Sequence, residues 1–352
     1  MIFNKDQPNL YLIQNIMNPL IESDCPDCNF LEDATIARRD FLKLAGTTAA
    51  VAATVPAAFA KPAKGKPAEA LLKELFATLT KEQRQKVALA IDAGAGKNRV
   101  PTRLGMYNRA LNNAKIGNLY TKAQQELIER ALKAICSDDE GYHKISRDEE
   151  FDNSGSLQGC GAHFFGDPNK GQFSWLFTGH HLTVRCDGNT IPGAAFGGPI
   201  YYGHIAGGYS EKNVYRFQTK AVQSVYDALD AKQRQAAVIA QGSPGEMAKS
   251  VKHRERPYPG IGIGELSPDQ REQVLKVMRA CVAPFRKEDG DEVMDIVKAN
   301  GGLEKINLAF YKDKRSTDEK IRWHFWRLEG PGFVWNYRVL GHVHCFVNIA
   351  RV

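Results

Sequence analysis

Four of the nine histidines occur in two tight pairs, His180-His181 and His342-x-His344. Imidazole nitrogens are ligands that zinc, copper and iron all accept. Side chains alternate between the two faces of a strand, so His342 and His344 point the same way if 343–349 forms a strand. The opposite face is then an apolar row of Val343, Cys345, Val347 and Ile349. The spacing predicts two ligands of one metal ion.

The first histidine pair lies in an aromatic and β-branched run, 173–186, which we predict to be one strand. In a regular strand His180 and His181 point to opposite faces, although Gly179 would allow a bulge. His181 then shares a face with Trp175 and Arg185. We expect His181 to be the third ligand, and His180 to be a further ligand or to hold the others in place.

Three imidazoles and an open position would match a catalytic site for zinc, copper or iron. We expect an enzyme, with oxidation chemistry favoured over metal-dependent hydrolysis because no obvious carboxylate base accompanies the histidine pairs. Weaker candidates for the surroundings of the metal, or for a substrate groove, are His204, Trp175, Arg185 and Asn348. The substrate, whether a small molecule or a polymer, does not follow from these residues.

A non-enzymatic alternative remains open, because strand histidines also serve as hydrogen-bonded structural groups. In that interpretation aromatic residues line a groove for a ligand such as a glycan. These residues are Trp175, Phe177, Trp323, Phe325 and Trp335. A third interpretation is a metal used only for folding, in which case chelation unfolds the chain.

Other function classes lack their signatures. The sequence contains no G-x-S-x-G elbow and no H-E-x-x-H motif, and no G-x-G-x-x-G opens a strand–helix unit. The formal net charge is +7, but it is not concentrated in any long basic run. We therefore expect neither nucleotide-dependent chemistry nor a nucleic-acid partner.

A capping residue, two spacers and a glutamine occur together four times and predict helix starts. The four boxes are Thr80–Gln83, Thr121–Gln124, Asp230–Gln233 and Ser267–Gln270. Their spacing is irregular, which argues against a helical repeat array. Their role is structural.

Three runs at the C-terminus predict consecutive antiparallel strands: 321–328, 333–340 and 343–349. Helices combined with such strands predict an α+β fold, an antiparallel sheet with helices packed around it. We expect one domain over 68–352, mainly helical in 68–150 and sheet-containing in 151–352.

The N-terminal segment has the pattern of an export signal. Arg38-Arg39 precedes a mildly apolar run that ends at Ala58-Phe59-Ala60. This pattern predicts a twin-arginine signal peptide over 1–60, cleaved after Ala60 and followed by a linker over 61–67. The expected partner is the twin-arginine export machinery, and the expected location is periplasmic or extracellular. The run is too short and too weakly apolar for a stable membrane span in the mature form.

Five cysteines follow the predicted leader: Cys136, Cys160, Cys186, Cys281 and Cys345. An exported protein can keep disulfides, and a bridge between Cys160 and Cys186 would flank the first histidine pair. The connectivity does not follow from the sequence.

Several of these residues resemble one known family. They are Phe165-Gly166-Asp167-Pro168, Trp175, Gly179-His180-His181-Leu182, Gly330-Pro331 and His342-x-His344. Together they resemble the domain of unknown function 3500 family over most of the mature chain, with Gly-His-His-Leu the most specific match. The resemblance implies an exported protein in which both histidine pairs form one site, and it implies no reaction.

Overall fold

The computed structural model describes residues 67–352, except 97–98, 189, 241, 243, 245–255, 313–320 and 340. The predicted signal peptide over 1–60 and most of the predicted linker over 61–67 lie outside the described residues. Export and cleavage after Ala60 therefore stay predictions.

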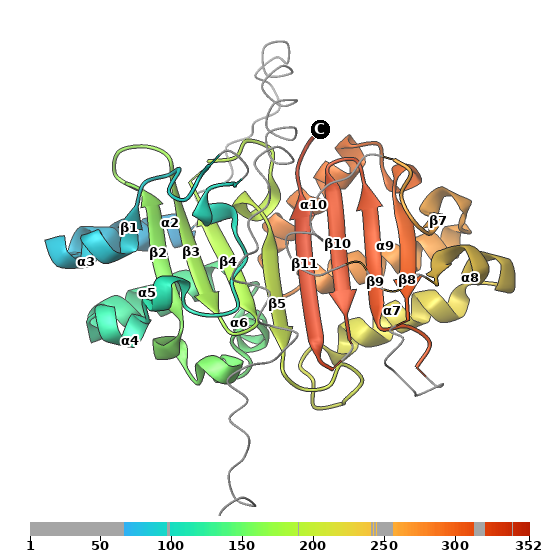
Figure 1. The fold of residues 1–352 in the computed structure, drawn as a ribbon, viewed down its shortest axis with the longest axis horizontal. Coiled ribbons are helices and arrows are strands. Elements are labelled where there is room, and N and C mark those ends of the chain that lie inside the picture. Colours follow the sequence, from blue (N-terminus) through green and yellow to red (C-terminus); the bar gives the residue numbers. More distant parts are fainter. Residues whose placement is uncertain are drawn as a thin grey trace, which may run out of the picture.

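In the residues that the structure describes, eleven strands form a single sheet in the order β1-β2-β3-β4-β5-β11-β10-β9-β8-β6, with β7 paired to β8 (Figure 1). The strands are β1 (Ala88–Leu89), β2 (Gly161–Gly166), β3 (Phe173–Gly179), β4 (Leu182–Asp187), β5 (Ile200–His204), β6 (Val238–Ile239), β7 (Ile261–Gly262), β8 (Asn307–Tyr311), β9 (Phe325–Gly330), β10 (Phe333–Arg338) and β11 (Val343–Ile349). The three predicted C-terminal strands are present as β9, β10 and β11, and both of their pairings are antiparallel.

The predicted α+β class is confirmed, but the expectation of a purely antiparallel sheet is wrong. The short strands β1 and β6 pair in parallel with β2 and β8. Both follow directly from a helix, and at two residues each they are too short for a pattern of alternating side chains to reveal them.

Nine α-helices accompany the sheet in the described part of the chain. They are α2 (Pro67–Thr78), α3 (Lys81–Val87), α4 (Ile116–Leu119), α5 (Lys122–Ile135), α6 (Asp139–Ser146), α7 (Arg216–Ala228), α8 (Ala231–Ala237), α9 (Pro268–Val282) and α10 (Lys287–Ala299). All four predicted capping boxes are confirmed at the starts of α3, α5, α8 and α9, with both reciprocal hydrogen bonds formed in each.

The capping boxes also bind each other in pairs, which the irregular spacing concealed. The Gln83 and Gln124 side-chain amides exchange hydrogen bonds, and so do those of Gln233 and Gln270. Each glutamine therefore completes a helix start and joins it to a second one. This arrangement ties α3 to α5, and α8 to α9.

The paired boxes belong to one unit that occurs twice in the chain. The first copy contains α2, α3, β1, α5 and β2–β5, and the second contains α7, α8, β6, α9 and β8–β11. Equivalent packing recurs in detail: Phe76 meets Phe164 edge to face at 5.1 Å, and Tyr226 meets Phe310 in the same way at 5.1 Å. The copies lie side by side in Figure 1 and join where β5 pairs with β11.

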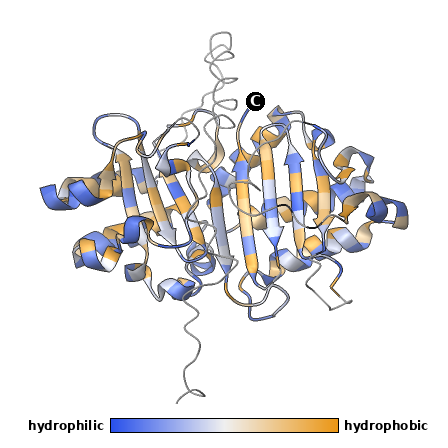
Figure 2. Cartoon of the chain, in the orientation of Figure 1, coloured by the Kyte–Doolittle hydropathy of each residue, from blue (hydrophilic) through white to orange (hydrophobic). Residues whose placement is uncertain are grey.

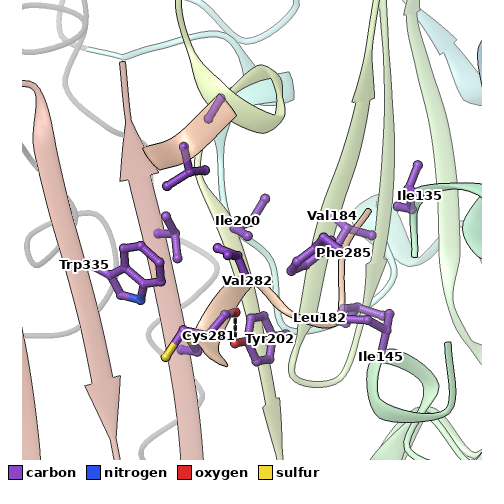
Figure 3. Packing of buried hydrophobic residues seen from close by; sticks show 14 of the residues in the cluster. Ile135, Ile145, Leu182, Val184, Ile200, Tyr202, Cys281, Val282, Phe285 and Trp335 are labelled. Carbon is purple, nitrogen blue, oxygen red and sulfur yellow. Dashed lines mark hydrogen bonds between the residues drawn. The ribbon is translucent and has the colours of Figure 1, made fainter. Parts of the chain in front are cut away.

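One face of the sheet packs against helices in a continuous hydrophobic core. Alternate strand residues, such as Val184 and Trp335, share this core with buried residues of α2, α5, α7, α9 and α10. Figure 3 shows Tyr202 beside Cys281, and the tyrosine hydroxyl donates a hydrogen bond to the Cys281 carbonyl oxygen. The alternation of hydrophobic and hydrophilic residues along the strands is visible in Figure 2.

The opposite face of the first copy is covered by the segment that contains η3 (Thr102–Leu104) and η4 (Leu111–Asn113). Thr183 accepts a hydrogen bond from the backbone of Tyr107, and Arg185 donates to the carbonyls of Arg103 and Gly105. Arg185 therefore anchors this segment to β4.

The prediction of one strand over 173–186 is wrong. The chain turns back at His180-His181, so β3 and β4 form a hairpin in which Gly179 pairs with Leu182. Histidines are unusual in two-residue turns, and His181 adopts a φ of 51°, in the left-handed region. The faces expected from one regular strand do not apply. Trp175 lies on the helix-covered face with Leu182 and Val184.

The suggested Cys160–Cys186 disulfide is also wrong, because the five cysteines after the predicted leader are buried and none of them forms a disulfide. Strand β3 lies between β2, which follows Cys160, and β4, which contains Cys186. Next-nearest strands are about 10 Å apart, beyond the Cα separation that a disulfide spans.

Among the helices that the structure describes, none combines the length and the apolar character needed to cross a membrane.

Candidate metal centre

The sheet brings both histidine pairs to the same end of its central strands. Leu182, at the start of β4, pairs with Tyr202 of β5, and Tyr202 in turn pairs with Cys345 of β11. The β3–β4 turn that carries His180 and His181 therefore lies beside the start of β11, where His342 and His344 are located. The seam between the two copies of the unit thus assembles a site from two distant parts of the sequence.

Three imidazole rings converge there. The ring centroids of His181 and His342 are 4.6 Å apart, those of His181 and His344 are 4.9 Å apart, and those of His342 and His344 are 4.7 Å apart. One ligand atom from each of the three residues lies within 4.8 Å of the others. A tetrahedral ion bound at about 2.0 Å requires nitrogens about 3.3 Å apart, so closing around an ion takes at most about 1.5 Å of movement.

The predicted orientation of the second pair is confirmed. His342 and His344 lie together, while Val343, Cys345, Val347 and Ile349 belong to the core on the other face. Gly203 lies opposite His344 on β5 and leaves room for its ring. A Cβ at Gly203 would lie 3.2 Å from His344 Cδ2 and only 2.2 Å from the Val343 carbonyl oxygen.

Asp152 organises two of the histidines. Its carboxylate oxygens lie 2.6 Å from His181 Nδ1 and 2.8 Å from His204 Nδ1. A carboxylate at Nδ1 fixes the ring and leaves Nε2 of His181 for a metal, an arrangement typical of metal-binding histidines. Asp152 begins the short helix η5 (Asp152–Ser154) after α6, and no spacing pattern in the sequence connects it to either histidine pair. The sequence alone therefore does not reveal its place in the site.

The turn that carries His181 is held by hydrogen bonds from three directions. Asn108 Oδ1 accepts from the His181 backbone N–H at 2.7 Å, and Ser154 Oγ accepts from that of His180 at 2.8 Å. The His180 carbonyl accepts from Arg147 Nη2 at 2.6 Å. These contacts stabilise the left-handed conformation of His181.

Arg147 and Asp152 form a buried ion pair behind the histidines. Arg147 Nε lies 3.6 Å from Asp152 Oδ2, and both side chains are 1% exposed. Burial alone would raise the pKa of the Asp152 carboxyl. The attraction of Arg147 and the hydrogen bonds with His181 and His204 outweigh burial and hold this pKa well below its ordinary value. Asp152 is therefore ionised and acts as an acceptor.

The environment keeps the rings of His181 and His344 neutral. Burial, chiefly, lowers the pKa of His181 well below its ordinary value, although the hydrogen bond with Asp152 opposes this effect. Burial likewise lowers the pKa of His344, reinforced by the positive charge of Arg338. Neutral imidazole is the form that binds a metal.

His180 packs against His181. The two ring centroids are 3.8 Å apart, and His180 Nδ1 accepts a hydrogen bond from the Asn153 backbone N–H at 3.3 Å. His180 also forms a second close group with Asp152 and His181. Its position favours the predicted supporting role over that of a ligand.

The weaker candidates fall into two sets. His204 joins the site through Asp152, whereas Trp175 is in the core and Arg185 binds backbone carbonyls. Asn348 is four residues along β11 from His344, about 13 Å at the rise of a strand. The aromatic residues of the suggested groove are all buried, so they do not line an exposed surface.

Arg338 is a member of the site that sequence analysis did not single out. It pairs with His344 across β10 and β11. Its Nη2 lies 3.3 Å from His344 Nε2 and 3.4 Å from His342 Nε2. A guanidinium therefore faces one ring nitrogen of each of these two histidines.

The model of the family described as a protein of unknown function (DUF3500) matches residues 63–349, and the chain belongs to this family. The resemblance carried by Gly-His-His-Leu and His342-x-His344 is thereby confirmed. Comparison with curated proteins and with solved structures finds no match.

Proposed function

We propose that this protein is an exported metalloenzyme whose centre is formed by His181, His342 and His344. The observation that carries the proposal is the convergence of three buried imidazoles, one of them fixed at Nδ1 by Asp152. Copper, iron and zinc all suit a set of imidazole ligands. The twin-arginine leader supports export in the folded state, with the metal bound before release.

Oxidation and reduction at copper or iron is the reaction class that we favour. Asp152, the carboxylate of this cluster, is already bound by two histidines and by Arg147, so it is not available as a general base. The three rings supply neutral nitrogen ligands and leave further coordination positions for a substrate.

Metal-dependent hydrolysis is the second candidate, and one contact supports it. His204 Nδ1 bonds to Asp152, its side chain is 16% exposed, and a histidine oriented by a carboxylate can act as a general base. The identity of the bound metal distinguishes the two reaction classes. Copper or iron that changes oxidation state supports oxidation and reduction, and zinc supports hydrolysis.

Metal analysis of protein exported by its native route tests the proposal. We expect one equivalent of metal in the wild type and none in a His342→Ala/His344→Ala double variant. His143→Ala is the matched control, because its side chain is 50% exposed and lies outside the cluster. Wild-type protein that is folded and free of transition metal would overturn the proposal. Unfolding on chelation would instead assign the metal a structural role.

A further inference from the structure

Left-handed backbone is concentrated beside the candidate metal centre. In the part of the chain that the structure describes, nine residues other than glycine have a positive φ, and six of them lie in the segment 147–152 or at His181. The six are Arg147, Asp148, Glu149, Phe151, Asp152 and His181. This conformation is costly for residues with a side chain, because Cβ approaches the following carbonyl oxygen. The segment that carries the buried ion pair is therefore strained.

The segment 147–155 closes over the β3–β4 turn mainly through polar contacts. The Asn153 backbone N–H donates to His180 Nδ1 at 3.3 Å, and Ser154 Oγ accepts from the His180 backbone N–H at 2.8 Å. Phe151, the one apolar residue of the segment, is 1% exposed. Opening the segment therefore requires the loss of a few hydrogen bonds and the withdrawal of one aromatic ring from the core.

The candidate ligands are covered in this closed arrangement. His181 is 0% exposed, His344 is 1% exposed and His342 is 8% exposed. An ion reaches the nitrogens of side chains this deeply buried only when a covering segment moves. The segment 147–155 contacts the turn of His181 directly, and opening it withdraws the Asp152 carboxylate from the His181 ring.

We propose that the segment 147–155, which we call the strap, opens to admit the metal ion to the three histidines. The inference rests on the proposed function. Backbone strain raises the free energy of the closed strap and so favours opening, whereas the hydrogen bonds to the β3–β4 turn restore the closed form. The strain thus sets how often the histidines become accessible.

Two exposed positions allow this strain to be changed in opposite directions. Glu149 has a φ of 69°, which glycine adopts without strain, so Glu149→Gly favours the closed strap. Gly155 has a φ of 73°, and a Cβ there meets no atom within 4 Å, so Gly155→Ala adds backbone strain without a steric contact. The matched controls are Glu150→Gly, at an exposed neighbour whose φ is not positive, and Gly302→Ala, at a glycine outside the strap with a φ of 74° and equally open surroundings.

Stopped-flow absorption measures the uptake of cobalt(II), and dilution into a chelator measures its release. We expect both rates to rise about threefold or more in Gly155→Ala and to fall about threefold or more in Glu149→Gly. This is the size expected from one left-handed residue after the greater freedom of glycine is subtracted. The affinity should stay unchanged, because the strap is closed both with and without the metal. Gly302→Ala should change neither rate, and Glu150→Gly should not slow uptake.

The outcomes separate the two proposals. If the wild type binds cobalt and neither Gly155→Ala nor Glu149→Gly changes the rates, the metal enters elsewhere and the role of the strap is overturned. A change in affinity at unchanged uptake rate also overturns it, because the segment would then only shape the site. Failure of the wild type to bind cobalt overturns the metal centre, and the strap with it. If Gly155→Ala does not fold, the comparison of Glu149→Gly with Glu150→Gly decides.

Discussion

Replacing Asp152 with asparagine removes a charge and one acceptor while it keeps the shape of the side chain. The carboxylate accepts from both His181 and His204, whereas an amide has a single acceptor oxygen and a donor in place of the second. One of the two rings must then turn, change tautomer or lose its partner. If it is His181, the metal-facing nitrogen is no longer held in position.

The expected loss has two parts. Substituting a group that orients a metal ligand costs about 10–100-fold in affinity, or about 1.4–2.8 kcal/mol. Leaving Arg147 buried without its counter-charge costs about 3 kcal/mol in the free energy of unfolding. The second effect acts on the whole fold, so the two must be measured separately.

Cobalt(II) titration against a competing chelator measures the first part, and denaturant unfolding of the metal-free protein measures the second. Asp148→Asn is the matched control, because the Asp148 side chain is 74% exposed and it neighbours His143 rather than the cluster. If folded Asp152→Asn binds cobalt as tightly as the wild type, Asp152 does not orient a ligand and our account of the site is incorrect.

Three further predictions concern stability. Gly203→Ala should lower the free energy of unfolding by about 1–3 kcal/mol, because the added Cβ would lie 2.2 Å from the Val343 carbonyl oxygen. The control is Gly207→Ala, whose Cβ would be 3.6 Å from its nearest neighbour. Calorimetry compares the two variants, and equal melting temperatures would contradict the prediction. Burial lowers the pKa of His163 to about 4, so the unfolded chain takes up this proton first as the pH falls below the ordinary value of 6.5. Between pH 7.5 and pH 4, the free energy of unfolding of the wild type should therefore fall by about 3 kcal/mol more than that of His163→Leu. Denaturant titrations at a series of pH values measure this, and parallel pH profiles of the two proteins would refute it. Gln270→Ala should lower the free energy of unfolding by about 1 kcal/mol or more, because it removes hydrogen bonds to the Ser267 backbone N–H at the helix cap, to Gln233 and to the Ala228 carbonyl. Urea unfolding measures this, and an unchanged free energy of unfolding would show that the paired boxes do not contribute to stability.

Features that depend on neighbouring residues could be predicted from the sequence. Each capping box depends on residues three apart, and the strand of His342 and His344 has strict alternation with an apolar row opposite. The convergence of the two histidine pairs was also predicted, although for an incorrect reason. His181 reaches the site from a turn, not from a face shared with Trp175.

Long-range features could not be predicted from one sequence. Asp152 reaches the histidines only because α6 ends just before it and the β3–β4 turn packs against it. Arg338 is placed by the register of β10 against β11, which depends on how that hairpin turns. The four boxes were correctly identified, but their pairing through Gln83–Gln124 and Gln233–Gln270 requires tertiary contacts.

The site lies at the junction between β5 and β11, and residues from both copies of the repeated unit contribute to it. Asp152, His181 and His204 belong to the part of the chain that contains the first copy of the repeated unit, whereas Arg338, His342 and His344 belong to the part that contains the second. Neither part alone carries the full set of nitrogen donors, so a shorter protein with a single part would need to dimerise to build it. By the same logic, two polypeptides produced by cutting the chain between β5 and α7 should gain metal binding only when they are mixed.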